Sequence, residues 1–456
     1  MKIIESWKHF IHRKKQFTTF QIIIFGFLMV ILAGSFMLML PFATRDGKGA
    51  SFLDAIFTAT SATCVTGLAV QDTATYWSEF GQFIILIMIQ IGGMGVVTLA
   101  VAVAVISGRK IGLMQRSTMQ EAIAAPNVGG IVRMTSFIIK TSLIIEMLGA
   151  VAMFPVFYQE FGIGRGLWYS LFHSISAFCN AGFDLMGVKQ PSSSLTFFES
   201  NPVINVVIIL LILIGGIGFM TWEDIRENKF HIRKYRMQSK IILCMSAILI
   251  AMPTIFFFFH EFSTEKWDHL SLGAKIWGSL FQAVTPRTAG FNTVDLSQFS
   301  EAGQIFMLML MLIGGAPGST AGGIKMTTVA VLILTTFAVF KKREDTNCFG
   351  RRIPEDTVRY AAAILILYLV LFLSGSIFIS CIEDLPILTC LFETGSAIAT
   401  VGLSMGITSG LSVASKIVLI ALMFMGRVGG LTLVFAAMAP KEPRISKLPQ
   451  EKITVG

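Results

Sequence analysis

Four glycines, Gly67, Gly182, Gly290 and Gly402, are the residues of this chain whose spacing points most directly to chemistry. They follow one another at intervals of 115, 108 and 112 residues, and each is followed by Leu or Phe. Glycine adopts a positive φ without steric penalty, so a turn built on it can aim successive carbonyl oxygens at one axis. Rings of such carbonyls replace the hydration shell of a cation. Four turns of this kind predict a cation pathway.

A second unusual stretch is "IGGAPGSTAGGIKMTT", residues 313–328, which interrupts an apolar run from Gln304 to Phe340. Glycine and proline are poor helix formers, and a lysine is costly in hydrocarbon. Close helix packing does not explain a break of this length. Irregular backbone inside a membrane is tolerated where it lines a water-filled path, and the charge of Lys325 would oppose cations there. The segment is therefore predicted to be a gate.

The composition sets these residues in a membrane protein. Of 456 residues 54% are hydrophobic and 14% charged, and the mean hydropathy is +0.73. A helix needs roughly 20 apolar residues to cross a bilayer. Eight stretches are long enough, at 18–41, 80–106, 134–157, 203–222, 240–259, 304–340, 360–382 and 414–439.

The positive charges are distributed as the positive-inside rule requires. Of 36 Lys and Arg, 26 fall in residues 1–17, 107–140, 223–240, 341–359 and 440–456, and seven fall in the alternate connections. This asymmetry predicts cytoplasmic termini and removes the need for a nucleic-acid partner to explain the net charge of +9. The remaining three cations, Arg287, Lys325 and Arg427, lie within the apolar stretches.

Signals for other chemistry are missing from the sequence. It contains no Walker motif, no dinucleotide fingerprint and no metal-ligand cluster, and its six cysteines show no paired spacing. We therefore expect a protein that is not an enzyme, carries no cofactor and keeps its cysteines as free thiols.

The apolar stretches form a fourfold internal repeat. Shorter, moderately apolar segments lie between the first and second stretch of each pair, and glycine clusters recur in the second stretch. A half-helix entering from the outer face turns its partially negative C-terminal end toward mid-membrane, where it favours a cation. The predicted fold is an all-α integral membrane protein with four repeats of transmembrane helix, pore half-helix, filter loop and transmembrane helix, arranged with pseudo-fourfold symmetry around one pore. Its predicted parts are the N-terminal segment 1–17, repeats at 18–106, 134–222, 240–340 and 360–439, and the C-terminal tail 440–456; the half-helix segments are 51–68, 166–183, 276–291 and 386–403.

The motifs on these repeats resemble a known family. "ATCVTGL", "CNAGFD", "TPRTAGFN" and "ATVGLS", with "GGAPGSTAGGIK", closely resemble the Ktr/Trk/HKT superfamily of potassium transporters, over nearly the whole chain. Within it the chain looks most like the membrane subunit of a bacterial Ktr system, since two further N-terminal spans of Trk-type subunits are absent from it.

The resemblance implies positions for a filter and a gate. Gly67 at the first turn goes with potassium rather than sodium preference. Filter residues carried over from the family are Val65, Thr66, Gly67, Asn180, Ala181, Gly182, Thr288, Ala289, Gly290, Thr400, Val401 and Gly402. The intramembrane loop of the family lies under the filter and obstructs the path. Gate residues are Gly314, Gly315, Pro317, Gly318, Ser319, Thr320, Gly322, Gly323, Lys325 and Arg427.

The buried cations have alternative explanations. Arg287 is expected to hold its pore loop through carbonyl or carboxylate contacts. Arg427 is expected to face the pathway near the gate or, alternatively, to pair with a buried acid, for which Glu146 and Glu393 are the candidates.

The resemblance further implies a homodimer, potassium as the transported ion, sodium as an activator, and a cytosolic ring of regulatory subunits that bind adenine nucleotides. The basic segments 226–240 and 341–352 are candidate docking surfaces, and contact with anionic lipid explains them equally well. Two other functions stay open: a secondary cation transporter with alternating access, and a channel-like subunit of an ATP-driven potassium pump. Equal spacing and orientation of the repeats favour a pore.

Overall fold

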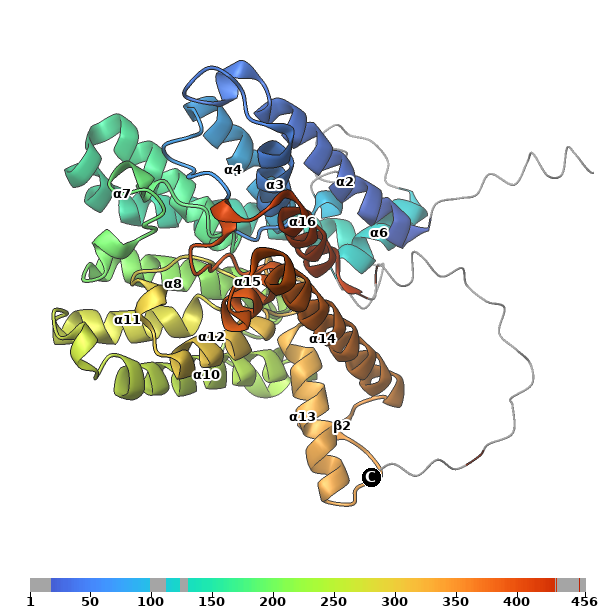
Figure 1. Cartoon of the computed structure of the whole chain (residues 1–456). Helices are drawn as coiled ribbons and strands as arrows, with labels where there is room; N and C mark the ends of the chain where they lie inside the picture. Colours follow the sequence, from blue (N-terminus) through green and yellow to red (C-terminus); the bar gives the residue numbers. More distant parts are fainter. Residues whose placement is uncertain (1–17, 99–111, 124–129, 431, 433–450, 452–456) are drawn as a thin grey trace, which may run out of the picture.

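The computed structural model describes residues 18–98, 112–123, 130–430, 432 and 451, and these residues are mostly helical (Figure 1). The expected segment 1–17 and, apart from residue 451, the expected segment 440–456 lie outside the described residues. A two-stranded antiparallel hairpin joins two of the helices, with strands β1 (Asn347–Cys348) and β2 (Arg351–Arg352).

The helices follow the order expected from the four predicted repeats. Repeat one contains α2 (Thr19–Leu38), α3 (Phe52–Thr63) and α4 (Glu79–Met94), and α6 (Leu113–Ile123) follows it. Repeat two contains α7 (Ile131–Phe178), α8 (Pro202–Gly216) and α9 (Phe219–Asn228). Repeat three contains α10 (Met237–Phe256), α11 (Leu272–Val284), α12 (Glu301–Leu312) and α13 (Met326–Phe340). Repeat four contains α14 (Glu355–Glu383), α15 (Ile387–Ala399) and α16 (Val413–Val428).

The first helix of each repeat is long and apolar enough to cross a membrane. Among the described residues, four helices meet this criterion by length and composition: α2, α7, α14, and α10 together with its π-helical continuation to Glu261. Helix α7 runs for 48 residues because the first helix and the half-helix of repeat two are joined, with a kink at Gly162, whose φ is 76°. The half-helices of the other repeats are the separate helices α3, α11 and α15.

The second helices differ from the sequence prediction. The sequence indicates spans at 80–106, 203–222 and 414–439 without predicting a break in them. In the structure each of these helices is interrupted within its glycine cluster, and residues 99–106, 431 and 433–439 lie outside the described residues. Gly95, Gly218 and Gly429 have φ of 87°, 89° and 91° and ψ of 131°, 141° and 134°, a conformation that side chains rarely adopt. Helices α8 and α9 consequently meet at 96°. In repeat three the interruption is longer, from the end of α12 to the start of α13.

Glycines in these clusters also let the second helix approach the end of its own half-helix. A Cβ atom on Gly92 would overlap the Thr63 carbonyl at the end of α3. A Cβ on Gly426 would overlap the Ile398 carbonyl in the last turn of α15 in the same way. Close backbone packing is therefore part of what these clusters do.

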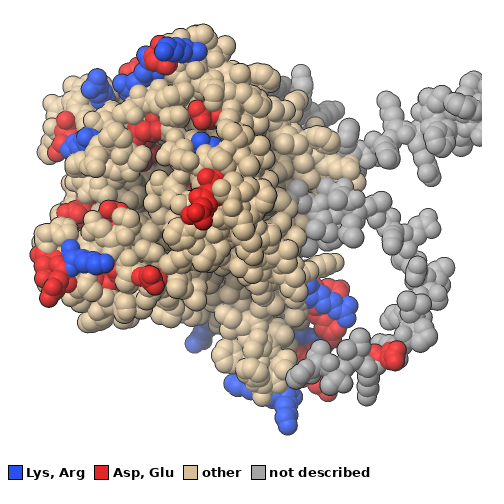
Figure 2. Space-filling model, in the orientation of Figure 1, with Lys and Arg blue, Asp and Glu red and all other residues tan. Residues whose placement is uncertain are grey.

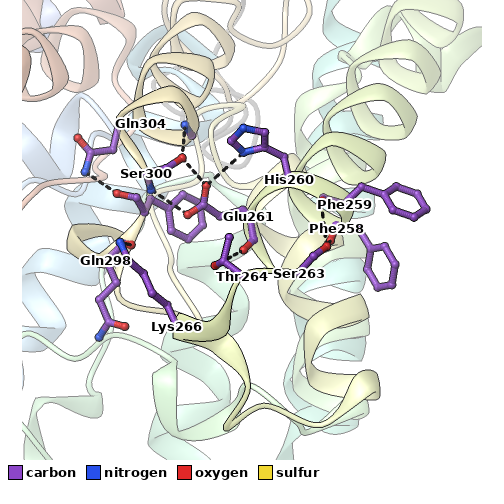
Figure 3. A network of polar contacts seen from close by, with 12 residues as sticks. Phe258, Phe259, His260, Glu261, Ser263, Thr264, Lys266, Gln298, Ser300 and Gln304 are labelled. Carbon is purple, nitrogen blue, oxygen red and sulfur yellow. Dashed lines mark hydrogen bonds and ion pairs between the residues drawn. The ribbon is translucent and has the colours of Figure 1, made fainter.

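Carboxylates at the ends of first helices fix the starts of second helices. Glu261, which is 1% exposed, accepts hydrogen bonds from the Ser300 amide and hydroxyl, both at 2.8 Å, at the N-terminus of α12 (Figure 3). Glu383 accepts from the Ser412 amide at 2.9 Å and the Ser415 hydroxyl at 2.5 Å at the start of α16. These contacts satisfy donors at the helix starts and fix the end of each first helix to the start of the second helix of the same repeat.

The outer surface matches a membrane environment. Most of the visible face is uncharged; most Lys and Arg lie toward its margins, while groups of Asp and Glu also lie near its middle (Figure 2). Helices α13 and α14 project beyond the body formed by the other helices (Figure 1).

Candidate ion pathway

The four glycine turns share one backbone conformation. Val65, Asn180, Thr288 and Thr400 have φ of 57°, 58°, 70° and 53°, and the glycine two residues later has a φ of 94°, 69°, 80° and 93°. In an extended strand successive carbonyls alternate in direction, and a left-handed residue at every second position reverses that alternation. Successive carbonyls of each turn can then point to the same side. Positive φ at four residues other than glycine marks a functional constraint.

The four turns lie beside one another in a closed ring. A Cβ atom on Gly67 would be 2.5 Å from the Ala181 oxygen, and one on Gly182 would be 2.8 Å from the Ala289 oxygen. A Cβ on Gly290 would overlap the Val401 oxygen, and one on Gly402 would overlap the Thr66 oxygen. The structure thus brings together the twelve residues expected at the filter. The middle residue of each turn presents its carbonyl to the glycine of the preceding repeat, and repeat one presents its carbonyl to the glycine of repeat four.

Serines on the half-helices anchor the turns. The amides of Thr66, Ala181 and Val401 each donate at 2.8 Å to the carbonyl of a serine five residues earlier, namely Ser61, Ser176 and Ser396. The hydroxyls of Ser61 and Ser396 also accept from the amides of Gly67 and Gly402, at 3.1 and 3.0 Å. In repeat three Thr285 accepts from the Ala289 amide at 2.9 Å. Sequence reasoning did not assign these residues a role, although Ser-Ala recurs at this position in three repeats.

One side of the ring faces an open pocket of about 300 Å³. Its wall includes all four ring glycines and three acids, Asp72, Asp184 and Asp295. Burial raises the pKa of Asp184, two residues after Gly182, to about 7, while the Met186 amide opposes this shift and the charge of Asp72 adds to it. The acids give the pocket a negative potential that attracts cations.

Residues 313–325 form a closed loop between α12 and α13, and residues 326–328, which we expected in the break, are the first residues of α13. The base of the loop is held by hydrogen bonds from the Gly314 amide to the Ile324 oxygen, at 2.8 Å, and from the Met326 amide to the Gly315 oxygen, at 3.1 Å. The Ser319 hydroxyl donates to the Ala316 oxygen at 2.7 Å. Short internal contacts therefore give the loop a defined shape.

The loop packs against the turn of repeat four. A Cβ on Gly322 would overlap the Thr400 hydroxyl, and a Cβ on Gly323, whose φ is 66°, would be 2.9 Å from the Ala399 oxygen. Among the described residues, the hydroxyls of Thr320 and Thr400 and the amide oxygen of Asn180 are buried without a hydrogen-bond partner. Unpaired oxygens at this position are available to a cation or its hydration shell.

The loop also contacts the broken end of α8. The Ala316 amide donates to the Gly216 oxygen at 2.9 Å, and the Phe219 amide donates to the Gly318 oxygen at 2.7 Å. A Cβ on Gly218 would be 2.8 Å from the Pro317 oxygen. A loop of repeat three is therefore fixed on elements of repeats two and four.

Arg427 and Lys325 bind backbone carbonyls of this region. Arg427 donates to the Thr320 oxygen in the loop and to the oxygens of Gly92 and Gly93, at 2.5 and 3.2 Å, at the end of α4. The Lys325 ammonium donates to the Ala321 oxygen at 2.6 Å. Of the two alternatives for Arg427, pairing with a buried acid is wrong.

The two candidate acids have other partners. Glu146 accepts from the Gln90 side-chain amide at 2.9 and 3.1 Å, and Glu393 accepts from the hydroxyls of Ser404, at 2.8 Å, and Thr408. The expectation for Arg287 is corrected as well. This side chain is 4% exposed and donates to the Ser246 hydroxyl at 3.0 Å, and its Nε and Nη1 have no partner in the described part of the chain.

Known proteins agree with this architecture. A family model described as a cation transport protein, TrkH, matches residues 4–447. The chain belongs to the TrkH family.

Three relatives that are 34–39% identical to this chain cover nearly its full length. The potassium/sodium uptake protein NtpJ of Enterococcus hirae is 38% identical, with 97% of this chain and 98% of the relative covered. Ktr system potassium uptake protein B of Bacillus subtilis is 39% identical over 97% of both chains, and that of Vibrio alginolyticus is 34% identical over 96% of this chain and 94% of the relative. The predicted resemblance to the membrane subunit of bacterial Ktr systems is confirmed, and the names of these relatives describe transport rather than catalysis.

A solved structure shares the fold. The potassium transporter TrkH from Vibrio parahaemolyticus superimposes with a TM-score of 0.73 at 22% identity, covering 94% of this chain and 86% of that one. The helical membrane-protein fold expected from the sequence agrees with this likeness.

Proposed function

We propose that this TrkH-family protein takes up potassium ions across the cell membrane through the ring of four glycine turns. The observation that carries the proposal is the closed ring of contacts between turns. The carbonyl oxygens of Ala181, Ala289 and Val401 each lie next to the ring glycine of the preceding repeat, and that of Thr66 lies next to Gly402 of repeat four. Carbonyl rings of this kind hold a dehydrated monovalent cation. The uptake activities named for the relatives from Enterococcus hirae and Bacillus subtilis support the choice of ion.

In this proposal the four repeats surround one pore with pseudo-fourfold symmetry. The half-helices α3, α11, α15 and the end of α7 direct their partially negative C-terminal ends at the ring. The acidic pocket forms the outer entrance, and both chain termini lie in the cytoplasm, as the distribution of Lys and Arg favours.

The loop 313–325 is proposed as the gate. It sits against Thr400, is bound by Arg427, and carries the positive charge of Lys325. A homodimer under a cytosolic nucleotide-binding ring is proposed to control the loop, with sodium as an activator. The relatives from Bacillus subtilis and Vibrio alginolyticus are named as components of Ktr systems, which supports an association with other subunits.

The alternatives differ in mechanism. A secondary transporter exposes a central site alternately to each side, and an ATP-driven pump subunit conducts only when a partner ATPase works. Ion flux from the purified protein in liposomes separates these cases. We expect flux of potassium down its gradient without ATP, at rates above those of a carrier, and smaller flux of sodium. Equal flux of the two ions, or flux that requires ATP hydrolysis, would contradict the proposal.

A further inference from the structure

A buried polar residue follows the same phenylalanine on every half-helix. Phe57, Phe172, Phe281 and Phe392 are each 0% or 1% exposed. The residues after them are Thr58, His173, Gln282 and Glu393, which are 2%, 0%, 0% and 0% exposed. These four positions therefore lie at equivalent places behind the ring, with one ionisable acid among them.

In three repeats this residue reaches the segment that follows the ring glycine. The ring nitrogen Nε2 of His173 accepts from the Leu185 amide at 3.3 Å. The Gln282 amide donates to the Thr293 hydroxyl at 3.4 Å. Glu393 accepts from the hydroxyls of Ser404 and Thr408. Each contact fixes the outer end of a filter turn to its half-helix.

Glu393 adds a charge to this arrangement. Among the described residues it forms no ion pair with Lys, Arg or His. In its ionised form the Glu393 carboxylate accepts hydrogen bonds and cannot donate, so in that form the hydroxyls of Ser404 and Thr408 both donate to it. The two hydroxyl oxygens lie 3.0 Å apart, and the Ser404 oxygen also accepts from the Gly406 amide at 3.0 Å. When both hydroxyls donate to Glu393, each oxygen still keeps a lone pair free to face a ligand.

That space belongs to the outer pocket. Ser404 and Thr408 line it together with the ring glycine Gly402. The pocket therefore contains two adjacent oxygen acceptors, backed by a buried negative charge, next to the entrance of the ring.

We propose that Ser404 and Thr408 form a docking site for a partly dehydrated monovalent cation, with Glu393 as the positioning residue behind them. The inference rests on the proposed function, since it places the site on the path into the ring. Two hydroxyls with one indirect charge suit potassium, whereas a divalent cation is held by direct carboxylate ligands.

The test measures potassium flux into liposomes against outside potassium concentration, using the full-length protein. Thr408→Val removes one ligand oxygen at nearly constant shape, and Thr408→Ser keeps it. We expect Thr408→Val to raise the potassium concentration for half-maximal flux severalfold, with maximal flux within about twofold of wild type, and Thr408→Ser to resemble wild type.

The role of Glu393 is tested by moving its charge. Glu393→Gln is expected to raise the half-maximal concentration at least about tenfold, because the carboxylate contacts the Ser404 hydroxyl at 2.8 Å and its charge would act on the cation at short range. Combining Gln282→Glu with Glu393→Gln places a carboxylate at the equivalent position of repeat three. The double variant is expected to recover part of the lost potassium affinity, which a purely structural role of Glu393 would not allow.

The outcomes separate the two claims. Wild-type protein without potassium flux would contradict the proposed function itself. Wild-type flux combined with an unchanged half-maximal concentration in Thr408→Val overturns the docking site. A failure of Gln282→Glu to restore any affinity overturns the electrostatic role of Glu393. If Glu393→Gln does not fold, the comparison of Thr408→Val with Thr408→Ser still decides whether the site exists.

Discussion

At the scale of single residues, the candidate filter depends on backbone conformations that the local sequence disfavours. Val65 and Thr400, which are β-branched, hold a positive φ that costs an ordinary residue roughly 1–2 kcal/mol. The hydrogen bonds that Ser61, Ser176 and Ser396 accept from amides of the turns offset this cost by fixing the residues that follow. The ring is thus built into the rigid ends of the half-helices, which suits a site that must discriminate ions by sub-ångström differences in size.

Gly67→Ser tests the ring itself. A Cβ at this position would lie 2.5 Å from the Ala181 oxygen, and the φ of 94° disfavours any side chain, so the turn must shift. We expect the preference for potassium over sodium to fall roughly tenfold, equivalent to about 1.4 kcal/mol. Uptake of both ions by the purified mutant in liposomes measures this, and an unchanged ratio would refute the assignment of Gly67 to the filter.

Asp184 predicts a pH dependence at the outer entrance. Its pKa is raised to about 7, chiefly by burial, so the carboxylate is charged above pH 7 and neutral below it. We expect potassium flux at limiting potassium to fall severalfold as the outside pH drops from about 8 to about 6. The folded state binds this proton more tightly than the unfolded state, so the same drop in pH stabilises the fold and unfolding does not explain the loss.

The control for this prediction is Asp184→Asn, which has no charge to titrate. Its flux should depend less on pH over the same range and should resemble that of the wild type at low pH. A mutant that keeps the full pH dependence would show that another group is responsible.

At the scale of elements, the sequence predicted the half-helices and the interruption at 313–328 but not the breaks at Gly95, Gly218 and Gly429. A glycine inside a helix costs only about 1 kcal/mol relative to alanine, so its presence does not decide whether the helix continues. Tertiary contacts decide it: Gly218 approaches the Pro317 oxygen of a different repeat. The partners of Arg427 were also out of reach, because carbonyl acceptors belong to every residue type and leave no signature in a sequence.

Gly92→Ala tests the packing of a second helix on its half-helix. The added Cβ would overlap the Thr63 carbonyl, and backbone atoms cannot rotate away as a side chain can. We expect a loss of about 1–3 kcal/mol in stability, seen as a lower midpoint of thermal unfolding in detergent. Gly410→Ala is the matched control, since nothing lies within 4 Å of its Cβ, and its midpoint should stay near that of the wild type. Equal midpoints for the two variants would contradict the packing role.

At the scale of the whole molecule, the loop 313–325 joins all four predicted repeats. It belongs to repeat three, hydrogen bonds to Gly216 of repeat two, and packs on Thr400 of repeat four. Arg427 extends the connection to Gly92 of repeat one. A shift of any repeat relative to the others would therefore strain the loop, which would let the proposed cytosolic partner act on the pathway without contacting the ring.

Shortening this loop separates gating from selectivity. Deleting residues 318–322 removes the part that meets Thr400 and the carbonyl of Thr320 that binds Arg427, so the obstructed state loses its contacts. A regulator can shift an equilibrium only through its different affinity for the two states, so its influence on flux should be lost with the closed state. We expect higher potassium flux in liposomes and weaker dependence on the regulatory ring, with the ratio of potassium to sodium largely kept because the carbonyl turns are intact.

Arg427→Gln should raise potassium flux in the same way. Lys416→Gln is the control, because it removes one positive charge from a side chain that donates to the Ser409 carbonyl instead of binding the loop, and it should leave flux unchanged. Flux that stays low without the partner would contradict a gating role of the loop. Flux that rises equally for sodium and potassium would contradict the assignment of selectivity to the ring alone.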